Sequence, residues 1–174
     1  MKLVWTTLLI LAGVFGVSCD AKYPRSTPEE LGNSVFAALR ANDRAAVQEM
    51  ILTEEEMLLL VDENPYAQGE EAQRRAEFRE KWPQQKENIQ TGIGKKFDRV
   101  VQQIQAKGKL SDLELLEVVV DPIDRRGSLR VTRIYLVTQL NREEIILRIK
   151  QANSINREWS LGMLGFSIYE QPFR

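Results

Sequence analysis

The stretch LRVTRIYLVTQL (129–140), followed by NR (141–142) and EEIILRIKQ (143–151), decides the fold. Apolar and polar residues alternate on both sides of Asn141-Arg142, which is the pattern of β-strands whose successive side chains point to opposite faces of a sheet. The two-residue connection predicts a hairpin. The apolar residues change phase near 132–134, which predicts a bulge or a strong bend. Ile145, Leu147 and Ile149 should form one buried face.

Further strands are expected on both sides of this hairpin. Residues 113–120 are β-branched and apolar, and residues 121–128 have the composition of turns. Residues 153–156 are predicted to form another turn, and a last strand is expected to run from Trp159 to about Tyr169. The C-terminal half should therefore be an antiparallel meander.

The N-terminal half has the signals of helices. Thr27 is a predicted cap, with Pro28 at the first helical position and Glu30 completing a capping box. Asp43 should cap a second helix, and residues 53–56 read as the capping box of a third. Helices that precede consecutive strands indicate an α+β protein, with N-terminal helices packed on a bent antiparallel sheet.

The middle of the chain predicts two helices with a break between them. Residues 68–81 are charged, with Phe78 and Trp82 on one buried edge, and Pro83 should interrupt or kink this helix. The run Gly92-Ile93-Gly94 lacks the spacing of a phosphate loop and is interpreted as a flexible joint. A further helix should end at Gly108. The apolar face of this helix is expected to pack with the apolar face of the first helix and with the sheet in one core. The residues expected to form this core are Leu31, Val35, Leu39, Phe97, Val101, Ile104, Ile145, Leu147 and Ile149.

The first nineteen residues read as a lipoprotein signal. Lys2 is followed by an apolar segment too short to span a bilayer, and Gly16-Val17-Ser18-Cys19 resembles a lipobox, in which small residues precede a cysteine that becomes acylated. Gly16 stands where leucine is commonest, so ordinary secretory cleavage is the alternative. The expected organisation is a signal peptide over 1–18, a tether over 19–26 and one domain over 27–174. The protein is then expected in the cell envelope, anchored to the membrane by lipid on Cys19.

Composition excludes several functions. The chain has no histidine and one cysteine, so catalysis by Ser-His-Asp or Cys-His groups and the common zinc sites are excluded. The 24 basic and 25 acidic residues give no general attraction to nucleic acid. No cofactor is indicated. Asp121 and Asp124 could bind a cation, but a role in a turn is the simpler interpretation, because the adjacent Arg125 and Arg126 would oppose cation binding.

Two stretches, TPEELGNSVFAALRANDRAAVQEMI (27–51) and EEIILRIKQANSINREWSLGML (143–164), resemble the NTF2-like (cystatin-like) superfamily. The resemblance is one of pattern and covers about residues 27–170. It implies a bent sheet wrapped around helices to form a cone with a cavity. Members include isomerases, dehydratases, transport factors and proteins without known activity, so the fold alone does not assign a function.

Two functional hypotheses follow. In the first, the protein is not an enzyme and binds an envelope protein or a small apolar ligand. In the second, it is an isomerase or dehydratase that uses a buried carboxylate and a tyrosine. The candidate ligand-binding residues are Tyr135, Trp159 and Arg133, with Glu117 as a further candidate acid or base; solvent exposure or cross-strand pairing is the alternative for those on strands. No catalytic residue is assigned.

Overall fold

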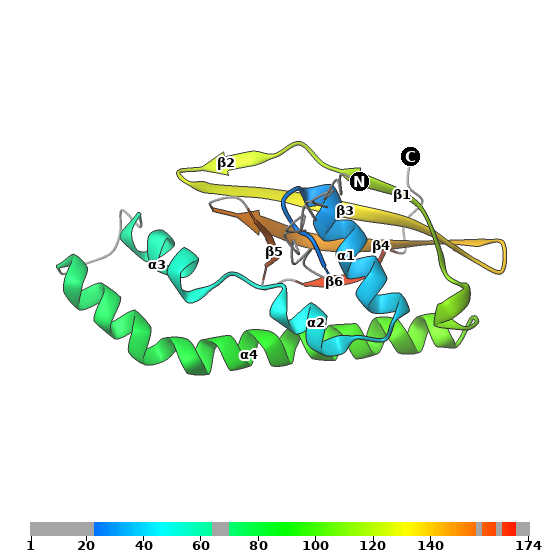
Figure 1. Cartoon of the computed structure of the whole chain (residues 1–174), viewed down its shortest axis with the longest axis horizontal. Helices are drawn as coiled ribbons and strands as arrows, with labels where there is room; N and C mark the ends of the chain where they lie inside the picture. The colour runs from blue at the N-terminus through cyan, green and yellow to red at the C-terminus, as the bar shows by residue number, and fades with distance from the viewer. Residues whose placement is uncertain (1–22, 64–69, 156–157, 163–164, 170–174) are drawn as a thin grey trace, which may run out of the picture.

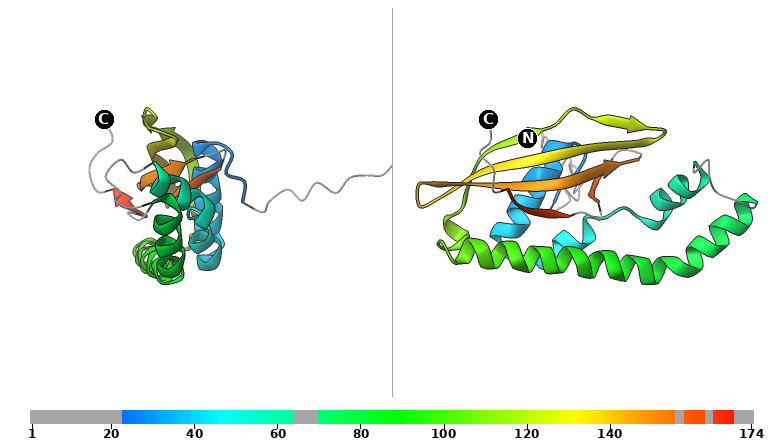
Figure 2. Two further views of the ribbon diagram at one scale, coloured as in Figure 1. Left: turned by 90° about the vertical axis from the view of Figure 1, so that its left-hand side faces the viewer. Right: turned by 180° about the vertical axis from the view of Figure 1, so that it is seen from behind.

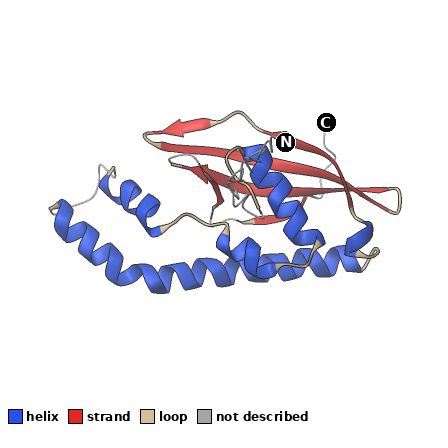
Figure 3. Cartoon of the chain, in the orientation of Figure 1, coloured by secondary structure: helices blue, strands red, loops and turns tan. Residues whose placement is uncertain are grey.

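The computed structural model describes residues 23–63, 70–155, 158–162 and 165–169. Within these ranges, four α-helices pack against a six-stranded antiparallel sheet that does not close into a barrel (Figure 1). Coloured by secondary structure, the helices gather on one side of the sheet (Figure 3). The predicted α+β class is confirmed.

The first three helices begin at the predicted caps. They are α1 (Pro28–Arg40), α2 (Arg44–Glu49) and α3 (Glu54–Asp62). The side chains of Thr27 and Asp43 accept backbone hydrogen bonds from Glu30 (3.1 Å) and Ala46 (3.0 Å). Thr53 and Glu56 form a reciprocal capping box. Each cap satisfies an N–H group that the first turn of a helix leaves without a partner.

The fourth helix corrects the prediction of two shorter helices. It is α4 (Glu71–Gln105), a continuous helix that contains both Pro83 and Gly92-Ile93-Gly94. Pro83 is exposed, so its ring and its missing N–H disturb only the solvent side, and α4 bends with its N-terminal part turned toward α3 (Figure 1). Ile93 and Gly94 are buried against the rest of the protein, which excludes a flexible joint there. Gly108 lies beyond the helix end, and its N–H donates to the Ile104 carbonyl (3.0 Å).

The sheet follows a short 3₁₀ turn over Leu110–Asp112. Its strand order is β1-β3-β4-β5, with β2 also paired to β3 and β6 also paired to β4. The strands are β1 (Glu114–Val120), β2 (Asp124–Arg126), β3 (Leu129–Leu140), β4 (Glu143–Ser154), β5 (Trp159–Leu161) and β6 (Phe166–Tyr169). Seen from behind, α4 runs along the length of this sheet (Figure 2).

The β3–β4 hairpin confirms the sequence interpretation in detail. Asn141 and Arg142 have φ angles of 53° and 70°, the left-handed conformation that a tight hairpin turn needs. The register of β3 against β4 shifts between Thr132 and Ile134, where the phase change predicted a bulge.

Two C-terminal expectations were wrong. Asn153 and Ser154 belong to β4 rather than to a turn, because they pair with β3 and with β5. The single last strand is two short strands: β5 pairs with the end of β4 and β6 with its middle. Gly165, with a φ of 57°, lies between them in a conformation that suits glycine.

The predicted core is confirmed. All nine of the helix and strand residues expected to form it are buried in one cluster between the helical layer and the sheet. The described members of this cluster lie between Tyr23 and Ile168, so the chain from residue 20 onward contains the whole described core.

The folded domain begins before Thr27, which corrects the boundary of the tether. Tyr23 Oη donates to Asp43 Oδ2 (3.0 Å), and the Pro24 carbonyl accepts from Ser34 Oγ (2.6 Å). The Arg25 carbonyl accepts from the Trp159 N–H (2.7 Å). Residues 23–26 are therefore attached to α1, to β5 and to the N-cap of α2. Residues 1–22, where the signal peptide and Cys19 fall, lie outside the described residues.

Candidate functional site

An apolar pocket of about 350 Å³ lies where α3 and the N-terminal half of α4 approach the sheet. The helical side is formed by α3, α4 and the segment between α2 and α3. Its lining side chains there are Ile51, Leu52, Met57, Leu60, Trp82 and Ile89. They come from segments far apart in the sequence, so no local motif marks this wall.

Trp82 is the largest of these side chains and is 5 % exposed. Its ring stacks on Phe78 one helical turn earlier, with 5.4 Å between the ring centroids. This pair is the buried edge that the sequence predicted for the charged part of α4. The same edge therefore forms a wall of the pocket.

The sheet side of the pocket carries its polar groups. Leu129 of β3, Leu161 of β5 and the adjoining Gly162 complete the apolar surface, and the β4 amides Gln151 and Asn153 line it as well. Gln151 Nε2 donates to Asn153 Oδ1 (3.0 Å). Apolar walls with a few placed polar groups are typical of small-molecule sites.

The carboxylate of Glu63 links the end of α3 to the sheet by a hydrogen bond beside the pocket. Glu63, which caps the C-terminus of α3, accepts a hydrogen bond through Oε2 from the backbone N–H of Ser128 (3.1 Å), at the turn before Leu129. This backbone hydrogen bond lowers the pKa of the Glu63 carboxyl below its ordinary value. A Cβ on Gly127, whose φ is 63°, would lie 2.6 Å from Glu63 Oε2, so the contact needs glycine.

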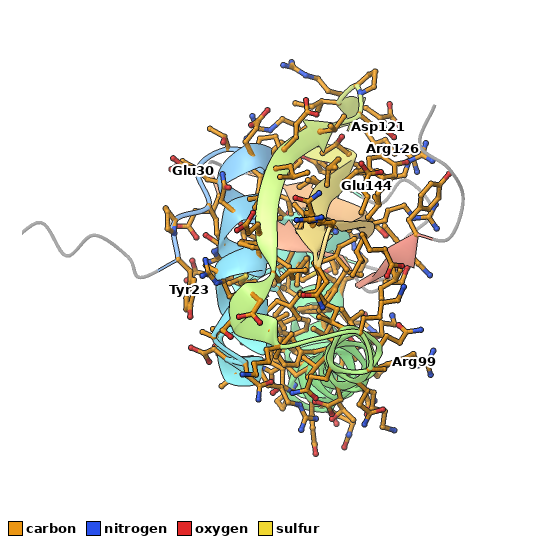
Figure 4. The ribbon with its side chains drawn as sticks, turned by 90° about the vertical axis from the view of Figure 1, so that its right-hand side faces the viewer. Tyr23, Glu30, Arg99, Asp121, Arg126 and Glu144 are labelled. Atoms are coloured by element: carbon orange, nitrogen blue, oxygen red, sulfur yellow. The ribbon has the colours of Figure 1, made fainter. Side chains whose placement is uncertain are left out.

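A second, polar pocket of about 550 Å³ adjoins the first, because Leu129 and Gln151 line both. It lies beside the β1–β2 connection and includes Lys150. Two ion pairs, Arg133–Asp121 (3.1 Å) and Arg126–Asp124 (3.0 Å), lie beside this connection. Figure 4 shows Asp121 and Arg126 on the side of the protein away from Tyr23. Both aspartates are thus paired with arginines. The described residues contain no cluster of three or more potential metal ligands.

The structure does not bring the predicted ligand-binding residues together. Trp159 is buried in the core, with Arg130 over its ring at 5.4 Å. Arg133 is exposed in the polar pocket, and Glu117 is exposed at an irregular register of β1. Tyr135 is 8 % exposed and packs edge-on against Tyr169, with 5.7 Å between centroids. Neither Tyr135 nor Trp159 lines the apolar pocket.

The fold and the pocket define an α+β protein with an open antiparallel sheet and an apolar pocket between sheet and helices. Comparisons with protein-family models, with curated proteins and with solved structures found no match. Among the described residues, no helix has both the length and the apolar composition that crossing a membrane requires.

Proposed function

We propose that this chain is a lipid-anchored protein of the cell envelope that binds a small apolar ligand, without transforming it, in the pocket between α3, α4 and the sheet. The apolar pocket carries the proposal. Its volume of about 350 Å³ falls within the range of small-molecule sites, roughly 300–1,000 Å³. Its described lining contains no Asp, Glu, Lys, Arg or Tyr, so it holds apolar surface rather than an acid–base pair.

The anchor in this proposal is a lipid on Cys19. Three residues separate Cys19 from Tyr23, where the packed chain begins. An extended chain advances about 3.5 Å per residue, so the segment from Cys19 to Tyr23 spans about 14 Å at most. The domain would therefore lie against the membrane with its α1 side, which carries Tyr23, nearest the lipid (Figure 4). A ligand that partitions into the bilayer would meet the protein there at high local concentration.

The architecture also supports the proposal that the domain is NTF2-like. Paired N-terminal helices precede a bent antiparallel sheet, and an apolar cavity lies between the two layers. An experimental structure with a neighbour of that superfamily as its best superposition would support the assignment.

Binding can be tested with the uncharged fluorophore N-phenyl-1-naphthylamine and the chain from residue 20 onward. Fluorescence should rise as the dye enters the pocket. Leu60→Glu should abolish the rise, because it places a carboxylate in the lining. Leu116→Glu is the matched control, since Leu116 is 53 % exposed on β1 outside the pocket.

Two results would contradict the proposal. One is an equal loss of fluorescence in both variants while both stay folded by circular dichroism. The other is turnover of a compound recovered from the protein by organic extraction, lost on changing a carboxylate while the fold survives. That second result would favour the isomerase or dehydratase alternative.

A further inference from the structure

Asn153 is a buried polar side chain that faces the apolar pocket. It is 6 % exposed and belongs to the pocket lining. Its Oδ1 accepts the hydrogen bond from Gln151, and its amide NH₂ is not among the fully buried side-chain atoms that lack a partner. Because Asn153 lines the pocket, its NH₂ can donate a hydrogen bond to a water or to a ligand there.

The two amides together offer one donor and one acceptor. With Gln151 donating to Asn153, the Asn153 NH₂ and the Gln151 Oε1 remain for a partner. If both amides were rotated by 180°, the free donor would be on Gln151 and the free acceptor on Asn153. A hydroxyl group, which both donates and accepts, matches the pair in either orientation.

Charge is not compensated in this pocket. No Asp, Glu, Lys or Arg is among its described lining residues. Arg130 follows the lining residue Leu129, but its guanidinium donates to Ser154 Oγ (2.7 Å) and lies over the Trp159 ring. A carboxylate or an ammonium would lose its hydration without meeting an opposite charge, and that loss outweighs a hydrogen bond to an amide.

From this geometry we propose that the ligand is an uncharged amphiphile, with an apolar body against Met57, Leu60 and Trp82 and a hydroxyl-type head group bound by Gln151 and Asn153. The inference rests on the proposed function, that the pocket binds an apolar ligand, and adds the chemical class. Asn153 supplies the contact that distinguishes a neutral polar head from a hydrocarbon end. The pocket discriminates against charge because its described lining residues offer no counter-ion.

The experiment displaces bound N-phenyl-1-naphthylamine with three probes of the same chain length, which are 1-decanol, decanoate and decylammonium. At neutral pH and below the concentrations at which the probes form micelles, 1-decanol should displace the dye at least about tenfold more strongly than either ion. Equal or stronger displacement by decanoate would overturn the inference. That outcome would place the head group past Gln151, near Lys150 of the polar pocket.

Variants separate the head-group contact from the apolar pocket. Asn153→Leu should weaken the binding of 1-decanol about fivefold relative to that of the dye, the scale of one neutral hydrogen bond. Asn33→Leu makes the same change at an exposed position of α1 and should alter neither quantity. Gln151→Met gives a second test if Asn153→Leu fails to fold. Unchanged 1-decanol displacement in a folded variant would overturn the role of the amides, whereas failure of the wild-type chain to bind the dye would count against the proposed function instead.

Discussion

Gly32 of α1 lies so close to Val118 of β1 that a Cβ added to Gly32 would be 2.8 Å from Val118 Cγ1. The same atom would lie 3.0 Å from Leu136 Cδ2. The absence of a side chain at Gly32 therefore sets how closely the first helix approaches the sheet. Gly92 of α4 is the opposite case, because a Cβ there would meet no atom within 4 Å.

These two glycines predict stability changes of opposite sign. Gly32→Ala should destabilise the fold by about 1–2 kcal/mol, because overpacking the helix–sheet contact outweighs the gain in helix propensity. Gly92→Ala should stabilise it by about 0.5–1 kcal/mol, since only the propensity gain applies. Urea unfolding of both variants measures the difference, and a stabilising Gly32→Ala would contradict the described approach of α1 to the sheet.

The core makes a second prediction. Leu147 is 1 % exposed in the centre of β4, so Leu147→Ala should lower the free energy of unfolding by about 2–5 kcal/mol. Leu116→Ala removes the same atoms from an exposed position of β1 and should change it by less than about 0.5 kcal/mol. Similar losses in both variants would mean that the sheet buries a different face.

The contact between Glu63 and Ser128 predicts a pH dependence. Its hydrogen bond lowers the pKa of Glu63 in the folded protein, so the contribution is present above the pKa of the unfolded chain and is lost as pH falls through the folded pKa. Glu63→Gln should therefore melt below the wild type at neutral pH and approach it in acid. A melting difference that stays constant through the acid range would contradict this role of the carboxylate.

The lipid anchor predicts the behaviour of two variants in cell fractionation. Cys19→Ser should release the protein from the membrane fraction, because it removes the acylated thiol. Ser18→Ala keeps a small residue before the cleavage site and should remain with the membranes. Retention of Cys19→Ser, together with the absence of a lipid mass on the wild-type N-terminus, would refute lipidation.

Local signals predicted most of the fold. The caps at Thr27, Asp43 and Thr53 and the hairpin at Asn141-Arg142 depend on near neighbours in the sequence, and all were confirmed. Pro83 was misleading because its cost depends on which side of the helix it occupies, and here it is exposed to solvent. Tertiary packing also keeps Ile93-Gly94 helical, since Gly94 lies against the side chains of Arg44 and Gln48 of α2.

The candidate site could not be predicted in the same way. Alternation along β3 shows which residues share a face, but the bulge after Thr132 changes which face is inward. Tyr135 was a plausible ligand contact on that basis, yet its ring packs on Tyr169. The apolar pocket is assembled from α3, α4 and three strands, so only Trp82 had a usable signal, as part of the expected buried edge of its helix.

The most direct test of ligand binding in this pocket is a ¹H–¹⁵N NMR titration of the chain from residue 20 onward with 1-decanol. The part of the chain from residue 20 onward has two tryptophans, Trp82 in the pocket and Trp159 in the core. The indole N–H signal of Trp82 should shift and saturate with ligand concentration, while that of Trp159 should move little. A Trp82 signal that stays in place while other signals saturate would contradict binding between α3, α4 and the sheet.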